Sequence, residues 1–311
     1  MRPGTGSRET VANRPVPLVY EVGPRDGLQN EQATVATADK IAFVNRLSES
    51  GLAVIEVGAF VSPTWVPQMA DTADVFAGIT RREGTRYAAL VPNLTGLERA
   101  AEANVSDVAV FAAASETFSR RNINQSIDES FAAYALVASA AQGLGLRVRG
   151  YLSTAFGCPY EGLVPVSLVV ELTRRLLDFG VYEVAVSDTI GVAHPGQVKR
   201  VLDELLKDVQ AQQLALHFHD TRGMALANVY AALDYGIRTF DASAGGLGGC
   251  PYAPGASGNL ATEDLLYMLH GLDFATGIDI DDVFAASTAL EAALGHPLPS
   301  KYAQARRAAS R

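Results

Sequence analysis

His217 and His219 are two histidines separated by one residue, about two-thirds of the way along the chain. They follow a short apolar run that ends at Leu216. Side chains two positions apart in a β-strand point to the same face, so the two imidazoles would project together from a strand end, as two ligands of one metal ion must. A pair of core or surface histidines that happens to alternate explains so short a motif equally well. The predicted strands and helices around the pair are needed to choose between these interpretations.

Length and composition indicate an ordinary globular chain. Its 311 residues are 48% hydrophobic and 19% charged, which is enough for a sizeable core. No apolar stretch approaches the roughly 18 residues of a membrane helix, and we expect no membrane association. Residues 1–16 are polar and contain Gly, Pro and Arg, which predicts a flexible leader. A transit peptide is the alternative, weakened by Glu9 and by the lack of an amphipathic pattern.

The net charge and the cysteines indicate which partners and which compartment to expect. The formal net charge of −9 disfavours nucleic-acid binding, which needs an excess of Lys and Arg, although local arginines could still bind an anionic small molecule. The two cysteines, Cys158 and Cys250, are expected to be free thiols in a reducing compartment, because no secretion signal precedes them. We therefore predict a cytoplasmic protein.

Short apolar segments alternate with helical patterns along the whole chain. Each predicted strand is of the kind that is buried on both faces in a parallel sheet, and the helical patterns bury one stripe. The predicted strands are 18–22, 53–57, 86–91, 107–112, 147–152, 183–187, 214–219 and 239–244. The predicted helices are 38–49, 94–103, 127–142, 165–179, 195–210, 224–235 and 262–269, with an extra helix at 280–294.

Eight strand–helix units are the number found in an α/β barrel of the (β/α)8 or TIM type. An open doubly wound sheet is the alternative, but it would carry a glycine-rich phosphate fingerprint after its first strand, and segment 23–27 lacks that spacing. We therefore expect a single catalytic barrel over residues 17–275. A C-terminal helical cap and tail would occupy residues 276–311.

The predicted barrel brings distant polar residues together. Chemistry in TIM barrels lies at the carboxyl ends of the strands, and strands one, seven and eight become neighbours when the barrel closes. Asp26 after the first strand could therefore meet His217 and His219 at the end of the seventh. Asn259, in the loop after the eighth strand, could reach the same point. One carboxylate, two imidazoles and an amide oxygen suit Mg²⁺ or Mn²⁺, and could also accept Co²⁺ or Zn²⁺.

Each of these residues also has a plainer explanation. Asp26 could cap a turn, Asn259 could be an ordinary loop residue, and Asp188 could belong only to a turn at the end of the sixth strand. Glu56 is harder to explain in this way, because a buried carboxylate inside an apolar strand needs a partner, and Arg25 is the obvious one. As a set converging on one barrel mouth, these residues favour the functional interpretation.

Both cysteines follow predicted strands on the same face of the barrel. Cys250 lies among glycines in the loop after the eighth strand, and such a loop, with few steric limits, can carry a reactive thiol over a site. Cys158 follows the fifth strand. A small apolar role or a disulfide between the two are the alternatives, and the reducing compartment disfavours the disulfide. The residues alone do not choose between the thiols.

Several longer segments resemble the 3-hydroxy-3-methylglutaryl-CoA lyase family. The resemblance spans roughly residues 16–303 and is more specific than any short motif. The segments that carry it are EVGPRDGLQNE (21–31), FVSP (60–63), WVPQM (65–69), RGY (149–151), GCPYEG (157–162), SDTIG (187–191), HFHDT (217–221), GGLGGCPYA (245–253) and GNLATED (258–264).

The resemblance implies a metal-dependent TIM barrel that cleaves 3-hydroxy-3-methylglutaryl-CoA into acetoacetate and acetyl-CoA. It implies that Arg25 stabilises the enolate oxygen of the departing thioester, that Glu56 orients Arg25, and that Cys250 protonates the enolate carbon. Asp188 and Ser62 would line the acyl pocket. The predicted catalytic residues are Arg25, Asp26, Glu56, Asp188 and Cys250, and the ligands of Mg²⁺ or Mn²⁺ are Asp26, His217, His219 and Asn259.

For the coenzyme A part of an acyl-CoA substrate, segment 119–124 matches the family and offers two guanidiniums to the phosphates. A solvated basic turn is the alternative. The residues predicted to bind the coenzyme are Ser62, Arg120, Arg121, Asn122 and Asn124. We also expect a homo-oligomer, a dimer or larger.

Departures from the family pattern keep a second substrate open. Gln32 stands where relatives often have Lys, which removes a possible phosphate contact, and Arg222 stands where an aromatic residue is common. Arg222 and Met224 keep open a lyase for a longer 3-hydroxyglutaryl-CoA, such as an isohexenyl analogue, as one alternative. A Claisen-condensing synthase of the same barrel superfamily usually carries a regulatory domain, for which 311 residues leave no room. A non-catalytic metal-binding protein is disfavoured by the joint presence of the predicted catalytic residues.

Overall fold

The apolar segments form eight parallel strands that close into a barrel. In the computed structural model, residues 15–248 and 258–309 are described. The strands are β1 (Leu18–Glu21), β2 (Val54–Ala59), β3 (Arg86–Leu90), β4 (Asp107–Ala113), β5 (Arg147–Ser153), β6 (Glu183–Asp188), β7 (Leu214–Phe218) and β8 (Thr239–Ala242). They pair in chain order, and β8 closes the sheet by pairing with β1. The predicted TIM barrel is confirmed.

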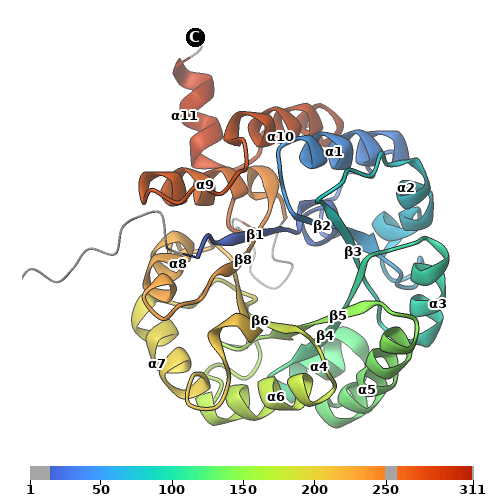
Figure 1. Ribbon diagram of the computed structural model, residues 1–311, viewed down its shortest axis with the longest axis vertical. Coiled ribbons are helices and arrows are strands. Elements are labelled where there is room, and N and C mark those ends of the chain that lie inside the picture. The colour runs from blue at the N-terminus through green and yellow to red at the C-terminus, as the bar shows by residue number, and fades with distance from the viewer. Residues whose placement is uncertain (1–14, 249–257, 310–311) are drawn as a thin grey trace, which may run out of the picture.

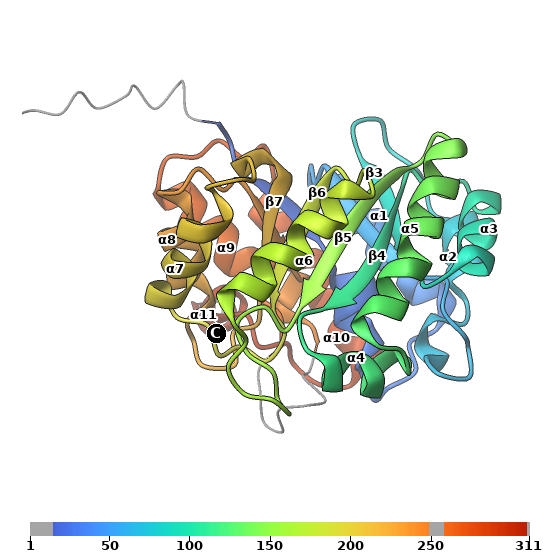
Figure 2. The same cartoon turned by 90° about the horizontal axis from the view of Figure 1, so that it is seen from below.

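Helices alternate with these strands and form a ring outside them (Figure 1; Figure 2 gives a side view). They are α1 (Thr37–Glu49), α2 (Thr72–Gly78), α3 (Leu94–Glu102), α4 (Glu116–Ile123), α5 (Ile127–Gly143), α6 (Val166–Asp178), α7 (Pro195–Leu205), α8 (Ala225–Leu233), α9 (Thr262–Gly271), α10 (Ile280–Leu294) and α11 (Lys301–Ala309). Helix α6 shows the reason for this packing: Val169, Leu172 and Leu176 are buried at spacings of three and four, so one stripe faces the sheet. In the described part of the chain, no helix is long and apolar enough to cross a membrane.

Three short helices, α2, α4 and α11, are additional to the predicted ones. Helix α4 covers only eight residues, too few for apolar periodicity to reveal. It is fixed by local contacts: Ser115 Oγ accepts a hydrogen bond from Phe118 N at 3.1 Å, and Asn124 ends the helix with φ = +54°. Arg120 and Arg121 therefore lie on a helix and not in a turn, although both are exposed to solvent.

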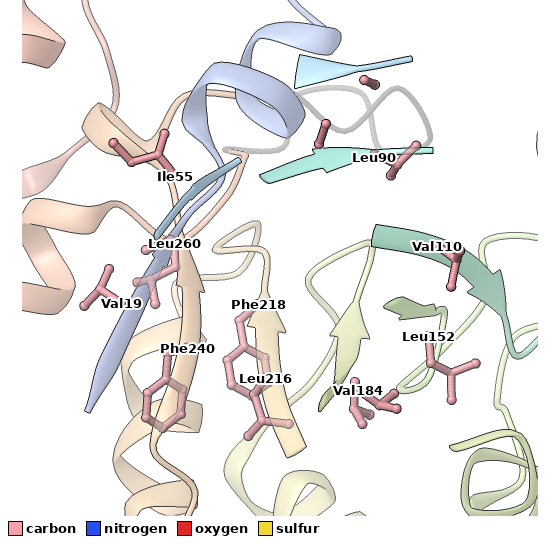
Figure 3. Packing of buried hydrophobic residues seen from close by; sticks show 14 of the residues in the cluster. Val19, Ile55, Leu90, Val110, Leu152, Val184, Leu216, Phe218, Phe240 and Leu260 are labelled. Carbon is pink, nitrogen blue, oxygen red and sulfur yellow. The ribbon is translucent and has the colours of Figure 1, made fainter. Parts of the chain in front are cut away.

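The main hydrophobic core lies between the strands and the helices. Figure 3 shows part of it, including Val19, Leu216 and Phe240 from β1, β7 and β8. Inside the barrel a separate small cluster combines three alanines with one large ring, Tyr151. The alanines leave interior volume that longer polar side chains occupy.

The predicted extra helix at 280–294 is α10, and the segments on either side of it are hydrogen-bonded to the barrel. Asp279 N donates to Ser50 O at 2.8 Å, which joins the start of α10 to the end of α1. Ser300 N donates to Gly245 O at 2.8 Å, which joins the start of α11 to the turn after β8. The C-terminal helices thus support the loop region at the mouth of the barrel.

We expect Gly51→Ala to destabilise the protein more than Gly84→Ala. Both glycines have positive φ, +91° and +86°, where an L-residue costs roughly 1–2 kcal/mol. A β-carbon at position 51 would also press against the Gly277 carbonyl oxygen, whereas no atom of the described residues lies within 4 Å of one at position 84. Urea unfolding of both variants measures the difference. Equal losses of unfolding free energy would contradict close docking of the C-terminal segment.

Candidate active site

Asp26, His217 and His219 meet at the carboxyl end of the barrel. Asp26 lies in a short turn, residues 23–27, directly after β1, while His217 lies in β7 and His219 just beyond its end. One possible ligand atom from each residue lies within 4.8 Å of the other two. Asn259 pairs with His219 through an isolated β-bridge, and its Nδ2 donates to Asp26 Oδ2 at 3.0 Å. The structure thus brings the four predicted metal ligands together.

The donor atoms of this group fit a cation. His219 Nδ1 and Asn259 Oδ1 are buried and have no hydrogen-bond partner among the described residues. Buried polar atoms in folded proteins normally have one. A carboxylate, two imidazoles and an amide oxygen are suitable donors for a divalent metal ion such as Mg²⁺ or Mn²⁺. Both the orphaned atoms and the donor chemistry are therefore consistent with a bound cation.

Burial and neighbouring charges set the protonation of these groups. Burial raises the pKa of Asp26, but the charge of Arg25, helped by the two histidines, outweighs it and holds that pKa well below its usual range. Burial, with His217 nearby, lowers the pKa of His219 to about 4. For His217, burial lowers the pKa, yet the hydrogen bond and charge of Asp241 outweigh it and raise the pKa overall. Asp26 and His219 are thus held in the forms that can bind a cation.

Arg25 is anchored beside this cluster by two carboxylates. Its Nε donates to Glu56 Oε1, and its Nη1 donates to Asp26 Oδ1 at 2.7 Å. The second oxygen of Glu56 accepts a hydrogen bond from Tyr151 Oη at 2.8 Å, and the Tyr151 ring centroid lies 5.3 Å from the Arg25 guanidinium carbon. The predicted pairing of Glu56 with Arg25 is confirmed, while the part played by Tyr151 is new.

Asp188 lies behind the cavity wall. Its carboxylate accepts hydrogen bonds from Val192 N at 2.9 Å and Ala193 N at 3.0 Å, which orders the loop after β6. Burial raises its pKa to about 6, against the opposing effect of those hydrogen bonds. Its neighbours Ser187 and Thr189 line the cavity described next.

A cavity of about 700 Å³ opens over the cluster. Part of its wall consists of Arg25, Asp26, His217 and His219. Another part includes four of the residues predicted to bind the coenzyme: Ser62, Arg121, Asn122 and Asn124. The fifth, Arg120, forms an exposed ion pair with Glu116 at 2.8 Å. The cavity therefore joins the ligand cluster to one of the two predicted guanidiniums.

Of the two cysteines, the structure describes Cys158. Cys158 is buried, with its Sγ 2.9 Å from Ser115 Oγ. The sulfur also accepts hydrogen bonds from Tyr160 N at 3.3 Å and Glu161 N at 3.4 Å, and it takes no part in lining the cavity. Cys250, the predicted proton donor, lies outside the described residues.

Three further buried carboxylates support the site but do not stand out in the sequence. Glu21 accepts hydrogen bonds at 2.8 and 2.9 Å from backbone amides of the turns after β1 and β8. Glu263 accepts one at 2.7 Å from Gly245 N, and Asp241 contacts His217. The sequence signal for them is the same as for Glu56: each is a charged residue inside a segment otherwise suited to burial.

Comparisons with known proteins agree with this geometry. The family model described as HMGL-like matches residues 17–290. A hydroxymethylglutaryl-CoA lyase of Bacillus subtilis is 52% identical over 286 residues, covering 92% of this chain and 96% of the relative. A Pseudomonas aeruginosa relative named 3-hydroxy-3-isohexenylglutaryl-CoA/hydroxy-methylglutaryl-CoA lyase is 53% identical over 287 residues, with coverages of 92% and 96%. The crystal structure of a Bacillus subtilis HMG-CoA lyase matches with a TM-score of 0.93 at 51% identity, covering 94% of this chain and 98% of that one.

The family match runs from the residue before β1 into α10, so it includes all eight strands of the barrel and the loops that carry the described site residues. The identities of the two curated relatives extend over nine-tenths of the chain, which is far more than a shared barrel would require. The chain therefore belongs to the hydroxymethylglutaryl-CoA lyase family.

Proposed function

We propose that this protein is a metal-dependent lyase that cleaves 3-hydroxy-3-methylglutaryl-CoA to acetoacetate and acetyl-CoA. The observation that carries the proposal is the meeting of the Asp26, His217 and His219 cluster with the anchored Arg25 in one cavity wall. The similarity to curated lyases over 92% of the chain supports the choice of substrate.

A divalent cation, Mg²⁺ or Mn²⁺, is the cofactor in this proposal. Asp26, His217, His219 and Asn259 would hold it, with the remaining positions left to water or substrate oxygens. When bound, the cation supplies a Lewis acid that favours loss of the proton from the C3 hydroxyl of the substrate. The residues around it then have two tasks, to hold the substrate and to stabilise the charge that the reaction creates.

Arg25 is suited to the second task. Cleavage of the C2–C3 bond leaves an enolate on the thioester fragment, and its oxygen carries the developing negative charge. A guanidinium that is already fixed, through Nε to Glu56 and through Nη1 to Asp26, stabilises such a charge without reorganising. Tyr151 holds Glu56 in place through its hydroxyl. Asp188 contributes by ordering the loop after β6, of which Thr189 lines the cavity.

Protonation of the enolate carbon completes the reaction and releases acetyl-CoA. We assign this step to Cys250 on the family resemblance, because a thiol with an ordinary pKa of about 8.5 is a competent acid toward a carbanion-like carbon. The competing thiol, Cys158, is enclosed by Ser115 and by backbone amides away from the cavity lining, which argues against it.

Coenzyme A would lie along the wall formed by α4 and the loop after β2. Arg121 offers a guanidinium there, Asn122 and Asn124 offer amides, and Ser62 offers a hydroxyl. Arg120 would have to leave its ion pair with the neighbouring turn of α4 to reach a phosphate. The cytoplasmic location and the homo-oligomer belong to the same proposal. The free thiol of Cys158 supports the first, and the second stays a prediction.

The purified protein is expected to release acetoacetate from 3-hydroxy-3-methylglutaryl-CoA when Mn²⁺ or Mg²⁺ is present and to stop when EDTA removes the metal. Acetoacetate can be followed by coupling to its NADH-dependent reduction. An isohexenyl analogue of the substrate should be assayed beside it. Rapid turnover of that analogue with no acetoacetate from the methyl compound would contradict the substrate and retain the lyase class.

Replacing one metal ligand should remove metal binding without unfolding the barrel. We expect His219→Ala to weaken Mn²⁺ binding by more than about 100-fold, since losing a ligand costs more than the roughly 10- to 100-fold lost with an outer partner of a ligand. Electron paramagnetic resonance of free Mn²⁺ measures this directly. His270→Ala, at an exposed position on α9, is the control. Unchanged affinity in His219→Ala would contradict the ligand set.

Replacing the proposed proton donor should separate chemistry from metal binding. Cys250→Ser is expected to lower kcat by roughly 10²- to 10⁴-fold, the usual contribution of a general acid, with Mn²⁺ affinity unchanged. Cys158→Ser is the matched control and should retain most of the activity. The reverse pattern would show that the two thiols have been assigned the wrong way round.

A further inference from the structure

Behind His217, the interior of the barrel holds a line of charged side chains that none of the proposed chemical steps uses. Asp241 Oδ2 lies 3.2 Å from His217 Nδ1. Arg149 donates to the same carboxylate through two nitrogens, Nη2 to Oδ1 at 2.7 Å and Nη1 to Oδ2 at 3.2 Å. Glu183 in turn accepts a hydrogen bond from Arg149 Nε at 2.9 Å. The line thus runs from the metal-ligand cluster to the middle of the barrel.

Stability alone does not explain this arrangement. Arg149 is 0% exposed and Asp241 is 2% exposed, and a TIM-barrel interior is usually filled by branched apolar side chains. A buried ion pair is often no more stabilising than apolar residues of similar volume. Small interior residues, such as Ala109 beside Arg149 in the neighbouring strand, leave the volume that the guanidinium fills. The arrangement therefore indicates a role in the adjacent site.

The contact between Asp241 and His217 determines which ring nitrogen faces the site. The two residues are direct partners in the register of β7 and β8. A carboxylate beside Nδ1 accepts the proton of that nitrogen and leaves the lone pair on Nε2. Nε2 is the atom that faces Asp26, 3.9 Å from its Oδ2. Asp241 thus presents to the ligand cluster the nitrogen that can bind a cation.

We propose that Asp241 is a positioning residue for His217 and that Arg149 holds the Asp241 carboxylate in the required orientation. The proposal rests on the metal-dependent function proposed above and adds two residues to its support. The orientation of one histidine ligand therefore depends on charges built into the barrel interior.

An arginine is needed for this task. The planar guanidinium places two donors on Asp241 and a third on Glu183, a fork that a single ammonium group cannot reproduce. Its faces lie against the rings of Tyr20 and Tyr151, with the guanidinium carbon 3.9 and 4.9 Å from the ring centroids. These contacts fix the plane of the guanidinium and, through it, the plane of the Asp241 carboxylate.

Asp241→Asn tests the proposal, because asparagine keeps the size of the side chain but loses its charge. We expect the Kd for Mn²⁺ of the EDTA-treated protein, measured by electron paramagnetic resonance, to rise roughly 10- to 100-fold. The kcat should recover as Mn²⁺ is raised, and the KM for 3-hydroxy-3-methylglutaryl-CoA at saturating Mn²⁺ should stay near the wild-type value. A merely structural role would lower the unfolding temperature without this selective shift in metal affinity.

Asp107→Asn is the matched control. Asp107 is also a buried barrel carboxylate paired with an arginine, Arg86 at 2.5 Å, but it lies at the first residue of β4, at the amino end of the strands. This variant should lower the thermal unfolding temperature and leave the Kd for Mn²⁺ unchanged. Wild-type affinity in Asp241→Asn, or an equal loss of affinity in Asp107→Asn, would overturn the positioning role.

Arg149→Lys provides a second test, which also serves if Asp241→Asn does not fold. It keeps a positive charge near Asp241 but removes the fork, so Mn²⁺ binding should weaken in the same direction and by less. Wild-type affinity in this variant would contradict the role of Arg149. If the wild-type protein binds no Mn²⁺, the proposed function fails together with this inference. If the wild-type protein binds Mn²⁺ and cleaves the substrate, and the variants bind Mn²⁺ equally well, only the positioning role fails.

Discussion

Closure of the sheet between β1 and β8 is the constraint on which the site depends. Four consecutive residue pairs join these strands, from Leu18 with Thr239 to Glu21 with Ala242. An open sheet would leave the same strands at opposite edges, and Asp26 could not reach Asn259, which is 233 positions away in the sequence. Glu21 reinforces the closure, since its carboxylate binds backbone amides of the turns that follow both strands. The barrel topology therefore brings the metal-ligand residues together, and their chemistry then determines what they can bind.

The fold was predictable because its signals are local and repeated. Apolar strand segments and long amphipathic helices define a β/α alternation, and even the helix at 280–294 has the expected bounds. The short helices α2 and α4 are not among the predicted helices, because seven or eight residues hold too few apolar positions to show a helical period. Helix α4 also depends on a cap supplied by Ser115. Closure of the predicted barrel was also enough to assemble Asp26 with the two histidines.

What the sequence could not supply is the direction in which each side chain points. In β6, Ser187 is in register with His217, whereas Asp188 is in register with Phe218, so adjacent polar residues face opposite sides of the sheet. Likewise, successive residues of a helix point about 100° apart, and of the pair in α4 only Arg121 lines the cavity. Asp241 is a further example: its charge inside β8 marks a buried carboxylate, but the sequence does not indicate that this carboxylate faces Arg149 and His217.

The charges around Tyr151 show why a cation suits this barrel. Arg25 pairs with Asp26 and Glu56, and Arg149 pairs with Glu183 and Asp241, so these four carboxylates and two guanidiniums leave two formal negative charges. An uncompensated charge in a protein interior costs several kcal/mol. His219, whose pKa burial lowers to about 4, is neutral at physiological pH. Against the effect of burial, the contact with Asp241 raises the pKa of His217, so a protonated His217 would offset at most one of the two charges, and it must be neutral to bind a cation. One divalent cation would supply both missing charges at the point where Asp26 meets the histidines. A bound cation would thus neutralise the excess negative charge of the barrel interior. The same carboxylates that attract the cation also hold Arg25 and Arg149 in place.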